Sequence, residues 1–515
     1  MTQTSYNVAA DLLESNLRAG RGGKAAFIDP VRTVTYAELD GEARRTANLM
    51  RSLGLRHEDR VIMIVLDTVE FPMVFLGTML AGVVPIPLNT ALTNETYAFM
   101  LADSRAKALF VSAPLLATLE PVLAKLPELK IIVVGEGATG ERIDFTKKAR
   151  AGQSADFTPV ATHSDEPAFW LYSSGSTGTP KGAKHIHTSP MATAKLYAQG
   201  VLGIREDDVC LSAAKLFFAY GLGNALTFPM SVGATAVLNP ERPTPALMYA
   251  YLKKYQPTLF FGVPTLYAAM LGDGTLAQEE GSKRLRMCVS AGEALPEHIG
   301  KSWKARFGAD ILDGVGSTEL LHIFLSNAPG DVVYGTSGIA VGGYDLRLVD
   351  ENGREVVEGE IGELLVRAPS AAEGYWNQRE KSRATFEGEW TRTGDKYTRD
   401  AAGRYTYCGR TDDMFKVSGQ WVSPFEVESA LVSHPSILEA AVIANEDSDG
   451  LTKPKAFIVL KAGIEKAGIE AALKQHVQSR VGAWKYPRWI EIVESLPKTA
   501  TGKIQRFKLR DGGAA

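Results

Sequence analysis

The sequence has little cysteine and little excess charge, and each shortage excludes a class of protein. Its 515 residues contain three cysteines, Cys210, Cys288 and Cys408, which lie far apart. Neither a disulfide framework nor a cysteine-based zinc site is therefore expected, and a reducing cytoplasm is the natural compartment. Lysine and arginine total 56, and aspartate and glutamate total 59. The resulting net charge of −3 does not indicate a nucleic-acid-binding protein, which would carry an excess of positive charge.

The sequence also lacks a secretory signal and a clear membrane span. Residues 1–6 (MTQTSY) have no basic region followed by an apolar core, so export is not expected. One uncharged stretch, residues 71–88, nearly reaches the length of a bilayer span. Pro85 and Pro87 interrupt it, so a buried helix followed by a strand is favoured over membrane insertion.

Short β-branched runs alternate with helical stretches along the first two thirds of the chain. These runs cover residues 61–66, 108–111, 131–134, 235–238, 258–261 and 287–290. The alternation predicts parallel sheets flanked by helices. From about residue 344 the pattern becomes hairpin-like, with Asn352-Gly353 as a turn. We find no fixed-period repeat and no low-complexity tract.

The last hundred or so residues change to a short α+β pattern, which is long enough for an independent domain. The prediction is therefore an α/β protein with a large N-terminal domain, residues 1–411, made of helix-flanked sheets plus a β-rich subdomain from about 344. A small, mobile α+β C-terminal domain, residues 412–515, follows.

A phosphate-binding loop is predicted at residues 172–182 (YSSGSTGTPKG), directly after the apolar run 167–171. Small residues let backbone N–H groups converge on phosphate oxygens, hydroxyls add donors, and Lys181 supplies a positive charge. The spacing is not that of a Walker A loop, because Pro180 occupies the second glycine position. A flexible serine- and glycine-rich loop is the alternative interpretation.

Five further segments follow this loop in order: SAGEAL (290–295), GVGSTE (314–319), WTRTGD (390–395), GRTDDMFKVSGQWVSPFEVE (409–428) and PKTATGKIQR (497–506). Together with SSGSTGTPKG (173–182) they resemble the signatures of the adenylate-forming superfamily, which includes acyl-CoA synthetases, amino-acid adenylation domains and luciferases. The resemblance spans nearly the whole chain. It implies ATP and CoA as co-substrates and Mg²⁺ as the metal.

The resemblance also implies the residues that bind ATP. They are Ser173, Ser174, Gly175, Ser176, Thr177, Gly178, Lys181, Gly292, Glu293, Ala294, Asp313, Gly314, Ser317, Thr318, Asp395 and Arg410. Asp395 would accept hydrogen bonds from the ribose hydroxyls; a turn-stabilising aspartate is the alternative. For Arg410 the alternative is an ordinary surface ion pair.

Three residues are predicted to be catalytic: Thr177, Glu319 and Lys503. A carboxylate attacks ATP poorly because both are negative, so cations and hydroxyls must converge at the α-phosphorus. Glu319 suits Mg²⁺, a hard cation that prefers oxygen ligands, although it could also be a solvated carboxylate. In the family, the lysine at position 503 bridges the acyl carboxylate and the α-phosphate; solvation of a basic tail is the alternative.

The resemblance places a hinge at Asp412, about which the C-terminal domain would present first Lys503 and then the loop around Lys416. The CoA-binding residues implied are Lys416, Ser418, Gly419 and Trp421. Two partners are also considered: a lysine acetyltransferase that would remove the charge of Lys503, and a second copy of the chain in a homodimer.

The acyl pocket should be formed by residues 215–224, 261–267 and 314–324, which look most like benzoate-type CoA ligases. The matching pocket residues are Ala219, Tyr220, Gly221, Gly316, His322, Ile323 and Lys503. A flat ring stacks on aromatic and glycine surfaces, and Tyr220 would limit the depth for an alkyl tail. His322 could instead be a satisfied buried histidine.

The leading hypothesis is a ligase that activates benzoate or a simple substituted benzoate. Alternatives are a 4-hydroxybenzoate- or aminobenzoate-CoA ligase, a medium-chain fatty acyl-CoA ligase, a carrier-dependent adenylating enzyme, and a non-catalytic nucleotide-binding protein. Two departures from the family pattern are Val315, where tyrosine is common, and the bulky pair Gln420-Trp421. His185 and His187 form an H-x-H pair without a further ligand candidate nearby, so no metal is expected there.

Overall fold

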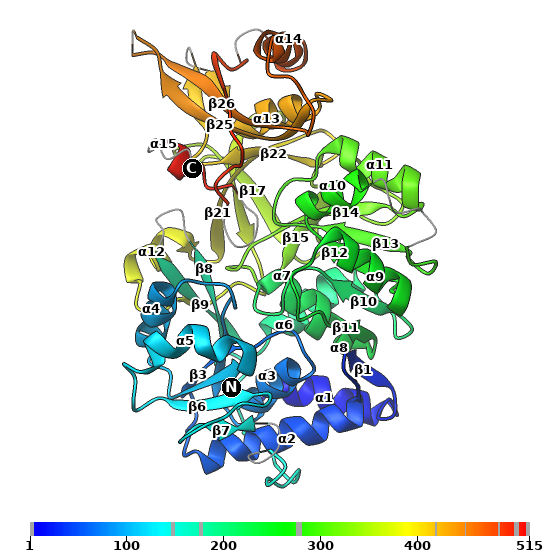
Figure 1. Cartoon of the computed structure of the whole chain (residues 1–515), viewed down its shortest axis with the longest axis vertical. Coiled ribbons are helices and arrows are strands. Elements are labelled where there is room, and N and C mark those ends of the chain that lie inside the picture. The colour runs from blue at the N-terminus through cyan, green and yellow to red at the C-terminus, as the bar shows by residue number, and fades with distance from the viewer. Residues whose placement is uncertain are drawn as a thin grey trace.

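The computed structural model describes residues 5–145, 150–174, 179–273, 281–417, 420–448, 450–482, 485–498 and 504–510. In Figure 1 the N-terminal elements (blue) lie at the bottom and the C-terminal elements (orange and red) lie at the top. None of the described helices combines the length and the apolar character that a bilayer span requires.

The first sheet is parallel and has the strand order β4-β3-β5-β6-β7. Its strands are β3 (Arg60–Ile64), β4 (Val84–Pro87), β5 (Ala108–Ser112), β6 (Lys130–Val134) and β7 (Ile143–Asp144). The helices of this region are α1 (Val8–Arg18), α2 (Tyr36–Ser52), α3 (Glu70–Leu80), α4 (Asn94–Ser104) and α5 (Leu116–Leu123), with a 3₁₀ turn at Ala113–Leu115. The uncharged stretch 71–88 is a buried helix, α3, followed by a buried strand, β4, as predicted.

The second sheet has nine strands in the order β16-β15-β14-β13-β12-β10-β11-β1-β2. Its bounds are β1 (Ala25–Ile28), β2 (Thr33–Thr35), β10 (Val209–Ser212), β11 (Thr235–Val237), β12 (Leu259–Gly262), β13 (Met287–Ser290), β14 (Ile311–Gly316), β15 (Ile323–Ser326) and β16 (Ile339–Ala340). The six strands from β1 to β14 are parallel, and β2, β15 and β16 are antiparallel edges.

Helices connect the strands of the second sheet. They are α6 (Ser189–Thr193), α7 (Ala219–Leu222), α8 (Phe228–Val232), α9 (Pro245–Tyr255), α10 (Pro264–Gly272) and α11 (Glu297–Phe307), with π-helical turns at Ala194–Gln199 and Gly223–Thr227. The segments predicted to bind ATP and the acid follow β13 and β14. Ligands of open parallel sheets bind at the carboxyl ends of the strands, so these segments lie where a site is expected.

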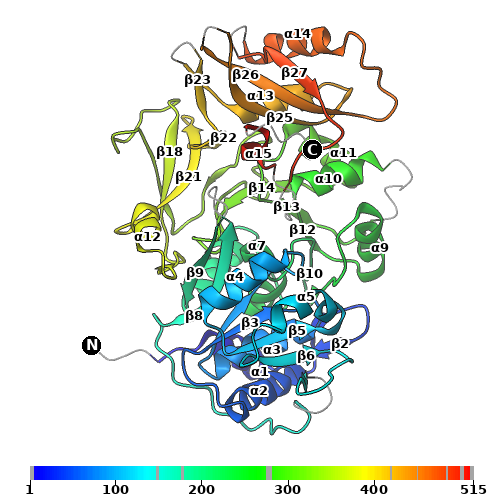
Figure 2. The same ribbon diagram turned by 60° about the vertical axis from the view of Figure 1, so that its left-hand side comes forward.

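Two smaller sheets complete the N-terminal part. A three-stranded sheet joins β8 (Pro167–Ser174), β9 (Pro180–Ile186) and β19 (Gly374–Tyr375). The β-rich subdomain contains β17 (Asp345–Val349), β18 (Gly362–Arg367), β20 (Phe386–Glu387), β21 (Trp390–Arg399), β22 (Tyr405–Arg410) and helix α12 (Arg379–Thr385). Figure 2 shows β18 and β21 side by side, with α12 near one end of them.

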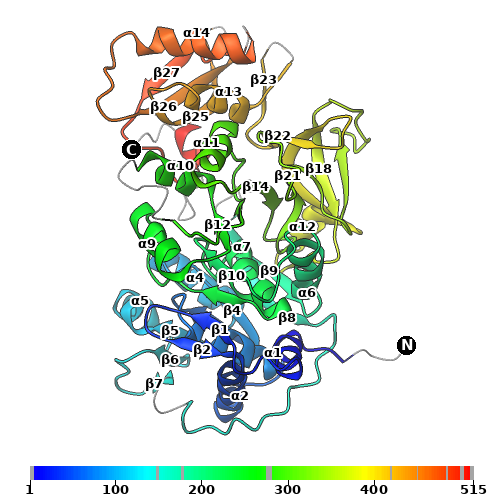
Figure 3. The same cartoon turned by 90° about the vertical axis from the view of Figure 1, so that its right-hand side faces the viewer.

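The C-terminal segment lies at the opposite end of the molecule from α1 and α2 in every view (Figures 1 and 3). Its elements are β23 (Phe415–Val417), β24 (Gln420–Val422), α13 (Pro424–Val432), β25 (Ile437–Glu446), β26 (Thr452–Leu460), α14 (Ile469–Val481), β27 (Trp489–Ile492) and α15 (Arg506–Arg510). Its buried hydrophobic residues form clusters of their own, separate from the N-terminal clusters. The predicted α/β fold, β-rich subdomain and α+β C-terminal segment are therefore confirmed, while the boundary at residue 412 stays a prediction.

Candidate active site

The two ends of the predicted phosphate loop meet a glutamate and a tyrosine. Ser173 on β8 pairs in register with Lys181 on β9. Ser173 Oγ donates to Glu319 Oε1 at 3.1 Å, and the Tyr375 hydroxyl donates to the same oxygen at 2.7 Å. Lys181 Nζ donates to the Tyr375 oxygen at 3.2 Å. The resulting Ser173–Glu319–Tyr375–Lys181 cluster joins the first and third predicted motifs in space.

The charges of this cluster are partly buried and balanced. Burial opposes ionisation of Glu319, but the hydrogen bond from Tyr375 and the charge of Lys181 outweigh it and hold its pKa below the ordinary value. Burial lowers the pKa of Lys181, Glu319 opposes this effect, and the charges of Lys381 and Arg410 add to it. A lysine that is half removed from water attracts phosphate oxygens more strongly than an exposed one.

The Glu319 carboxylate fits one ligand of a magnesium ion. Both hydrogen bonds within the cluster reach Oε1, so Oε2 takes part in neither of them. Within the described ranges, no group of three or more histidine, cysteine, aspartate or glutamate side chains could hold a metal alone. Magnesium commonly uses one or two carboxylates together with substrate phosphates and water, so this donor set suits a metal that arrives with ATP.

Asp395 and Arg410 are paired across neighbouring strands, β21 and β22. Arg410 Nη1 donates to Asp395 Oδ1 at 3.1 Å and to Thr393 O at 2.9 Å. Gly394 has φ +71°, and a Cβ there would lie 2.7 Å from Arg410 Nη2. Glycine is therefore required between the ribose-motif residues. Arg410 is held by the motif instead of forming an isolated surface ion pair.

The remaining predicted ATP residues follow β13 or lie on and after β14. Gly292, Glu293 and Ala294 follow β13, and Gly314 ends the buried part of β14. Asp313 is buried beside Ser337, whose Oγ lies 3.5 Å from Oδ2, and burial raises the Asp313 pKa well above its ordinary value.

The turn before Glu319 is held by its own side chains and by a histidine. Ser317 Oγ accepts from Leu320 N at 3.3 Å, and the Thr318 carbonyl lies 2.9 Å from His185 Nε2. His187 Nδ1 accepts from Val8 N at 3.2 Å. Both residues of the H-x-H pair therefore have structural partners, and His185 helps to fix the turn that carries Glu319.

The predicted acid pocket is assembled from distant segments. Ala219, Tyr220 and Gly221 lie on α7, Gly316 ends β14, and Ile323 begins β15. His322 is buried against Tyr220, with ring centroids 5.6 Å apart. The Tyr220 hydroxyl donates to Val289 O at 3.0 Å. Tyr220 and His322 therefore lie together beside Val289 of β13, while their role in binding the acid stays a prediction.

The predicted hinge lies shortly before the β23–β24 hairpin, which carries part of the predicted CoA segment. Asp412 follows β22, and Lys416 on β23 pairs in register with Trp421 on β24. The ammonium groups of Lys416 and Lys396 lie 4.6 and 5.0 Å from the Trp421 ring centroid. The other predicted site residues, Gly175, Ser176, Thr177, Gly178, Ser418, Gly419 and Lys503, lie outside the described residues, as does the side chain of Ser174.

Tyr375 is the site residue that the sequence interpretation missed. It lies on β19, a two-residue strand that pairs with β9 beside the phosphate loop. Its ring stands 4.4 Å from Lys181 Nζ. The available signal was the Gly-Tyr-Trp run at 374–376, whose glycine and aromatics indicate a close-packed strand and not a loop.

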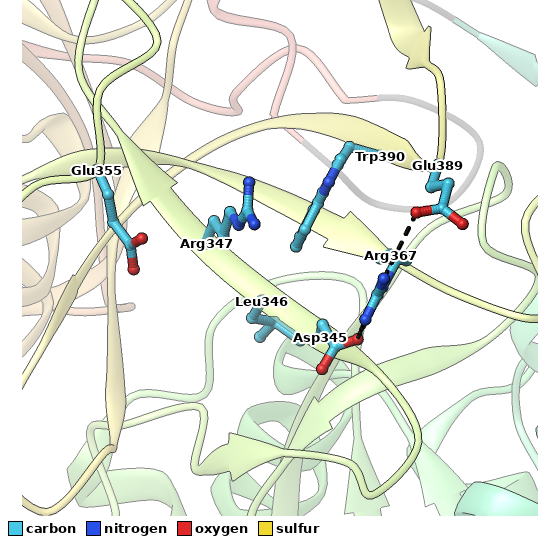
Figure 4. Close-up of a pocket in the computed structure, with 7 residues that line it drawn as sticks. All are labelled: Asp345, Leu346, Arg347, Glu355, Arg367, Glu389 and Trp390. Carbon is cyan, nitrogen blue, oxygen red and sulfur yellow. Dashed lines mark hydrogen bonds and ion pairs between the residues drawn. The ribbon is translucent and has the colours of Figure 1, made fainter.

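A separate surface cavity of about 360 Å³ lies on the β-rich subdomain (Figure 4). Trp390 and Arg347 face each other there, with the guanidinium 4.2 Å from the ring centroid. Arg367 forms ion pairs with Asp345 and Glu389 (Figure 4). Trp390 thus directs its ring into this cavity, although it begins the motif that ends with Asp395.

Together, the sheets and the Ser173–Glu319–Tyr375–Lys181 cluster define an adenylate-forming protein. The model of the AMP-binding enzyme family matches residues 14–376, and that of the AMP-binding enzyme C-terminal domain matches residues 426–503. The chain belongs to the AMP-binding enzyme family, which confirms the resemblance inferred from the motifs.

Curated relatives and solved structures are similar over almost the full chain. A 4-hydroxybenzoate–CoA/benzoate–CoA ligase of Rhodopseudomonas palustris is 53% identical, over 99% of this chain and 95% of that protein. A benzoate–CoA ligase of Thauera aromatica is 56% identical, over 98% of this chain and 96% of that protein. The crystal structure of a benzoate CoA ligase from Burkholderia xenovorans LB400 aligns with a TM-score of 0.91 at 49% identity, covering 98% of this chain and 100% of that one.

Proposed function

We propose that the protein is an AMP-forming aryl-CoA ligase that acts on benzoate or a simple ring-substituted benzoate. The observation that carries the proposal is the contact between Tyr220 and His322, which forms a short aromatic wall at the end of β13. The near-complete match to benzoate-CoA ligases supports the same substrate class. ATP and CoA are the co-substrates, and Mg²⁺ is the metal we propose.

The reaction has two half-reactions in one cleft. First, a carboxylate oxygen of the aryl acid attacks the α-phosphorus of ATP; the bond to the β-phosphate oxygen breaks, and pyrophosphate leaves. Second, the CoA thiol loses its proton and attacks the acyl carbon; the bond to the phosphate oxygen breaks, and AMP leaves. Aryl-CoA, AMP and pyrophosphate are the balanced products.

Each described residue has one role in the first half-reaction. Lys181 neutralises phosphate oxygens, Glu319 holds the magnesium ion, and Tyr375 fixes the position of Glu319. Asp395 binds the ribose hydroxyls while Arg410 orients its carboxylate. Lys503 and Thr177 complete the charge stabilisation at the α-phosphate on the basis of the family resemblance. The domain boundary at 412 and the hinge at Asp412 belong to the same proposal.

Three further features are proposals of the same kind. The three cysteines are free and buried, which supports a cytoplasmic location. Acetylation of Lys503 would remove the charge needed for adenylation, and intact-mass spectrometry of the purified protein tests it. Self-association into a homodimer is tested by sedimentation velocity.

Pyrophosphate and AMP release across benzoates, medium-chain fatty acids and amino acids, with and without CoA, tests the proposed function. We expect turnover with aryl acids that requires CoA, and a loss of at least about 100-fold in adenylation for Lys503→Ala. Turnover restricted to fatty acids would contradict the pocket assignment. No pyrophosphate release with any acid would favour a non-catalytic nucleotide-binding protein, and equal activity of Lys503→Ala would contradict the role of that lysine.

The 4-hydroxybenzoate alternative is favoured by one observation. The R. palustris relative, which is 53% identical, is named for both 4-hydroxybenzoate and benzoate. The same assay with paired substrates separates the two.

A further inference from the structure

The three-stranded sheet of β8, β9 and β19 presents three of the site residues on one face. Successive side chains of a strand point to opposite faces of a sheet, and residues paired across two strands share a face. Ser173 pairs with Lys181, and Tyr375 pairs with Ala183, two positions along β9 from Lys181. The side chains of Ser173, Lys181 and Tyr375 therefore share the front face, where two of them bond Glu319 Oε1.

The back face of the same sheet carries aromatic residues directly beside these positions. Tyr172 pairs in register with Gly182, and a Cβ on Gly182 would lie 3.4 Å from Tyr172 Cζ, so the ring lies across this glycine. The Trp376 N–H donates to Gly182 O at 2.8 Å. Each back-face aromatic residue is also the chain neighbour of a front-face residue. Tyr172 directly precedes Ser173, and Trp376 directly follows Tyr375.

One aspartate of α4 bonds both of these aromatic residues. Helix α4 lies beside β8 and β9 (Figures 1 and 2) and contacts β9. The Tyr172 hydroxyl donates to Asp103 Oδ2 at 2.6 Å, and Trp376 Nε1 donates to the Asp103 carbonyl oxygen at 2.8 Å. Burial raises the Tyr172 pKa, and the bond to Asp103 adds to this effect, so the hydroxyl remains a donor at physiological pH. Asp103 therefore connects β8 and the residue after β19 to one helix.

The position of Asp103 is unfavourable for the helix itself. It is the next-to-last residue of α4. The C-terminal end of a helix carries a partial negative charge, which disfavours a carboxylate there. The guanidinium groups of Arg60 and Arg105 lie 5.5 and 5.6 Å from the Trp376 ring centroid and help to hold the indole in place. Hydrogen bonds to the sheet, and not the stability of α4, therefore account for an aspartate at this position.

We propose that Asp103 is a positioning residue for adenylation. From the back of the sheet it sets the relative position of Ser173 and Tyr375, and these two residues orient the Glu319 carboxylate. This inference rests on the proposed aryl-CoA ligase activity. A displacement of about 1 Å in groups that align reactants slows the chemical step strongly, so a contact behind the sheet affects the reaction in front of it.

Two variants remove the contact from either side. Tyr172→Phe deletes only the hydroxyl, and Asp103→Ala deletes the acceptor. We expect each to lower kcat for pyrophosphate release by about tenfold, with the KM for the aryl acid changed by less than about twofold. Thioester formation from preformed aryl-adenylate and CoA should change by less than about twofold. A loss of folded protein would slow both half-reactions alike, so the difference between them reports positioning.

Two further variants assign the effect to the hydrogen bond. The double variant should be as slow as either single variant, because both substitutions remove the same interaction. Asp103→Asn keeps an acceptor oxygen at the same place, and it should retain at least about a third of the wild-type kcat. If Asp103→Ala does not fold, Tyr172→Phe and Asp103→Asn carry the test.

Tyr334→Phe is the matched control. Its hydroxyl also donates to an aspartate, Asp310 Oδ1, at 2.8 Å. Asp310 directly precedes β14, at the amino end of a strand whose carboxyl end leads to the site. We expect this variant to change kcat by less than about twofold. The inference is overturned if Tyr172→Phe behaves like the control, if it slows both half-reactions equally, or if the two single effects multiply in the double variant.

The wild-type protein separates this inference from the proposed function. If it adenylates aryl acids and Tyr172→Phe does so equally well, the role of Asp103 is wrong and the aryl-CoA ligase stands. If the wild-type protein releases no pyrophosphate with any aryl acid, the proposed function itself fails.

Discussion

At the residue scale, Tyr375 links the carboxylate of Glu319 to the ammonium group of Lys181 within the Ser173–Glu319–Tyr375–Lys181 cluster. Its hydroxyl donates to Glu319 at 2.7 Å and accepts from Lys181 at 3.2 Å. Tyr375→Phe removes both contacts and keeps the ring. Hydrogen bonds to charged groups contribute about 1.5–3 kcal/mol, so we expect adenylation to slow by about 10- to 100-fold in kcat/KM for ATP, as measured by pyrophosphate release.

Tyr249→Phe is the matched control for this prediction, because its hydroxyl donates to Met270 O far from the cluster. It should lower kcat/KM by less than about twofold. Equal effects of the two substitutions would mean that Tyr375 acts only through general stability.

Asp67 has a buried carboxylate and is not one of the residues of the Ser173–Glu319–Tyr375–Lys181 cluster. Oδ2 accepts from Leu216 N at 3.1 Å, within the predicted acyl-pocket segment 215–224, while Oδ1 has no partner among the described residues. Burial raises its pKa to about 6, against the opposing effects of Lys215 and the Leu216 N–H. An unfolded aspartate has a pKa near 3.9. The folded state therefore binds an extra proton between about pH 4 and 6, and stability falls as the pH rises through this window.

Asp67→Asn should remove this pH dependence. We expect the variant to have a free energy of unfolding about 1–3 kcal/mol higher than wild type at pH 7, with little difference below pH 4. Melting temperatures measured from pH 4.5 to 7.5 check the slope. Parallel curves for the two proteins would show that Asp67 is not the titrating group.

Sequence patterns single out the charged residues of the predicted site better than the neutral residues that contact them. Glu319, Lys181, Asp395 and Arg410 belong to motifs whose residue types already indicate phosphate, metal and ribose chemistry. Tyr375 and His185 act by touching Glu319 or its turn, and these contacts join residues 56 and 133 positions apart. No local pattern encodes such a contact, because it depends on how β19 and β9 pair.

At the element scale, α15 is fixed to α13 and to the residue after the predicted hinge. Arg506 contacts both Glu428 oxygens, at 3.0 and 2.6 Å, and Asp413 Oδ2 at 3.3 Å. Arg510 also bonds Asp413. Because α15 begins at Arg506, the last residue of the predicted lysine motif, these ion pairs connect that motif to the predicted hinge region.

Asp413→Asn should therefore affect one half-reaction more than the other. We expect adenylation, followed by pyrophosphate release, to slow by about tenfold, because small misplacements of a catalytic group are costly. Thioester formation from preformed aryl-adenylate should change by less than about twofold. Glu470→Gln, which breaks an exposed i,i+4 pair with Lys474 on α14, should leave both rates unchanged; equal slowing of both half-reactions by Asp413→Asn would contradict the argument.

The strands that were predicted correctly have a local sequence pattern of their own, a continuous apolar run. The runs at 61–66, 108–111 and 287–290 became β3, β5 and β13, because buried parallel strands are continuously apolar. β19 has two residues and exists only through its pairing with β9. The π-helical turn Gly223–Thr227 likewise depends on its packing beside His322. Neither has a sequence period that could reveal it.

At the scale of the whole molecule, the alternation of strands and helices was enough to predict the layers but not how the C-terminal segment docks. Docking depends on a few contacts between distant residues. Tyr407 and Phe425 pack with ring centroids 5.3 Å apart, and Lys416 forms an ion pair with Glu351 at 3.7 Å. Both pairs join the C-terminal segment to the β-rich subdomain, and no sequence pattern shows that Lys416 would meet Glu351 or that Phe425 would meet Tyr407.

The separate hydrophobic clusters predict that residues 1–411 fold without the remainder of the chain. The four large N-terminal clusters contain no residue beyond 411, and the two C-terminal clusters begin at Phe415. Removing residues 412–515 therefore exposes interface area but opens no core. We expect the fragment to retain a cooperative calorimetric transition within a few degrees of the corresponding transition in the full chain.

The same fragment should bind ATP and aryl acid but adenylate at least about 100-fold more slowly, because it lacks Lys503. Full-length Lys503→Ala is the control for this rate. If the two proteins are equally slow, the C-terminal domain contributes to the first half-reaction mainly through that lysine. A fragment much slower than Lys503→Ala would mean that docking of the domain also shapes the cleft, and an unfolded fragment would contradict the division of the chain at residue 412.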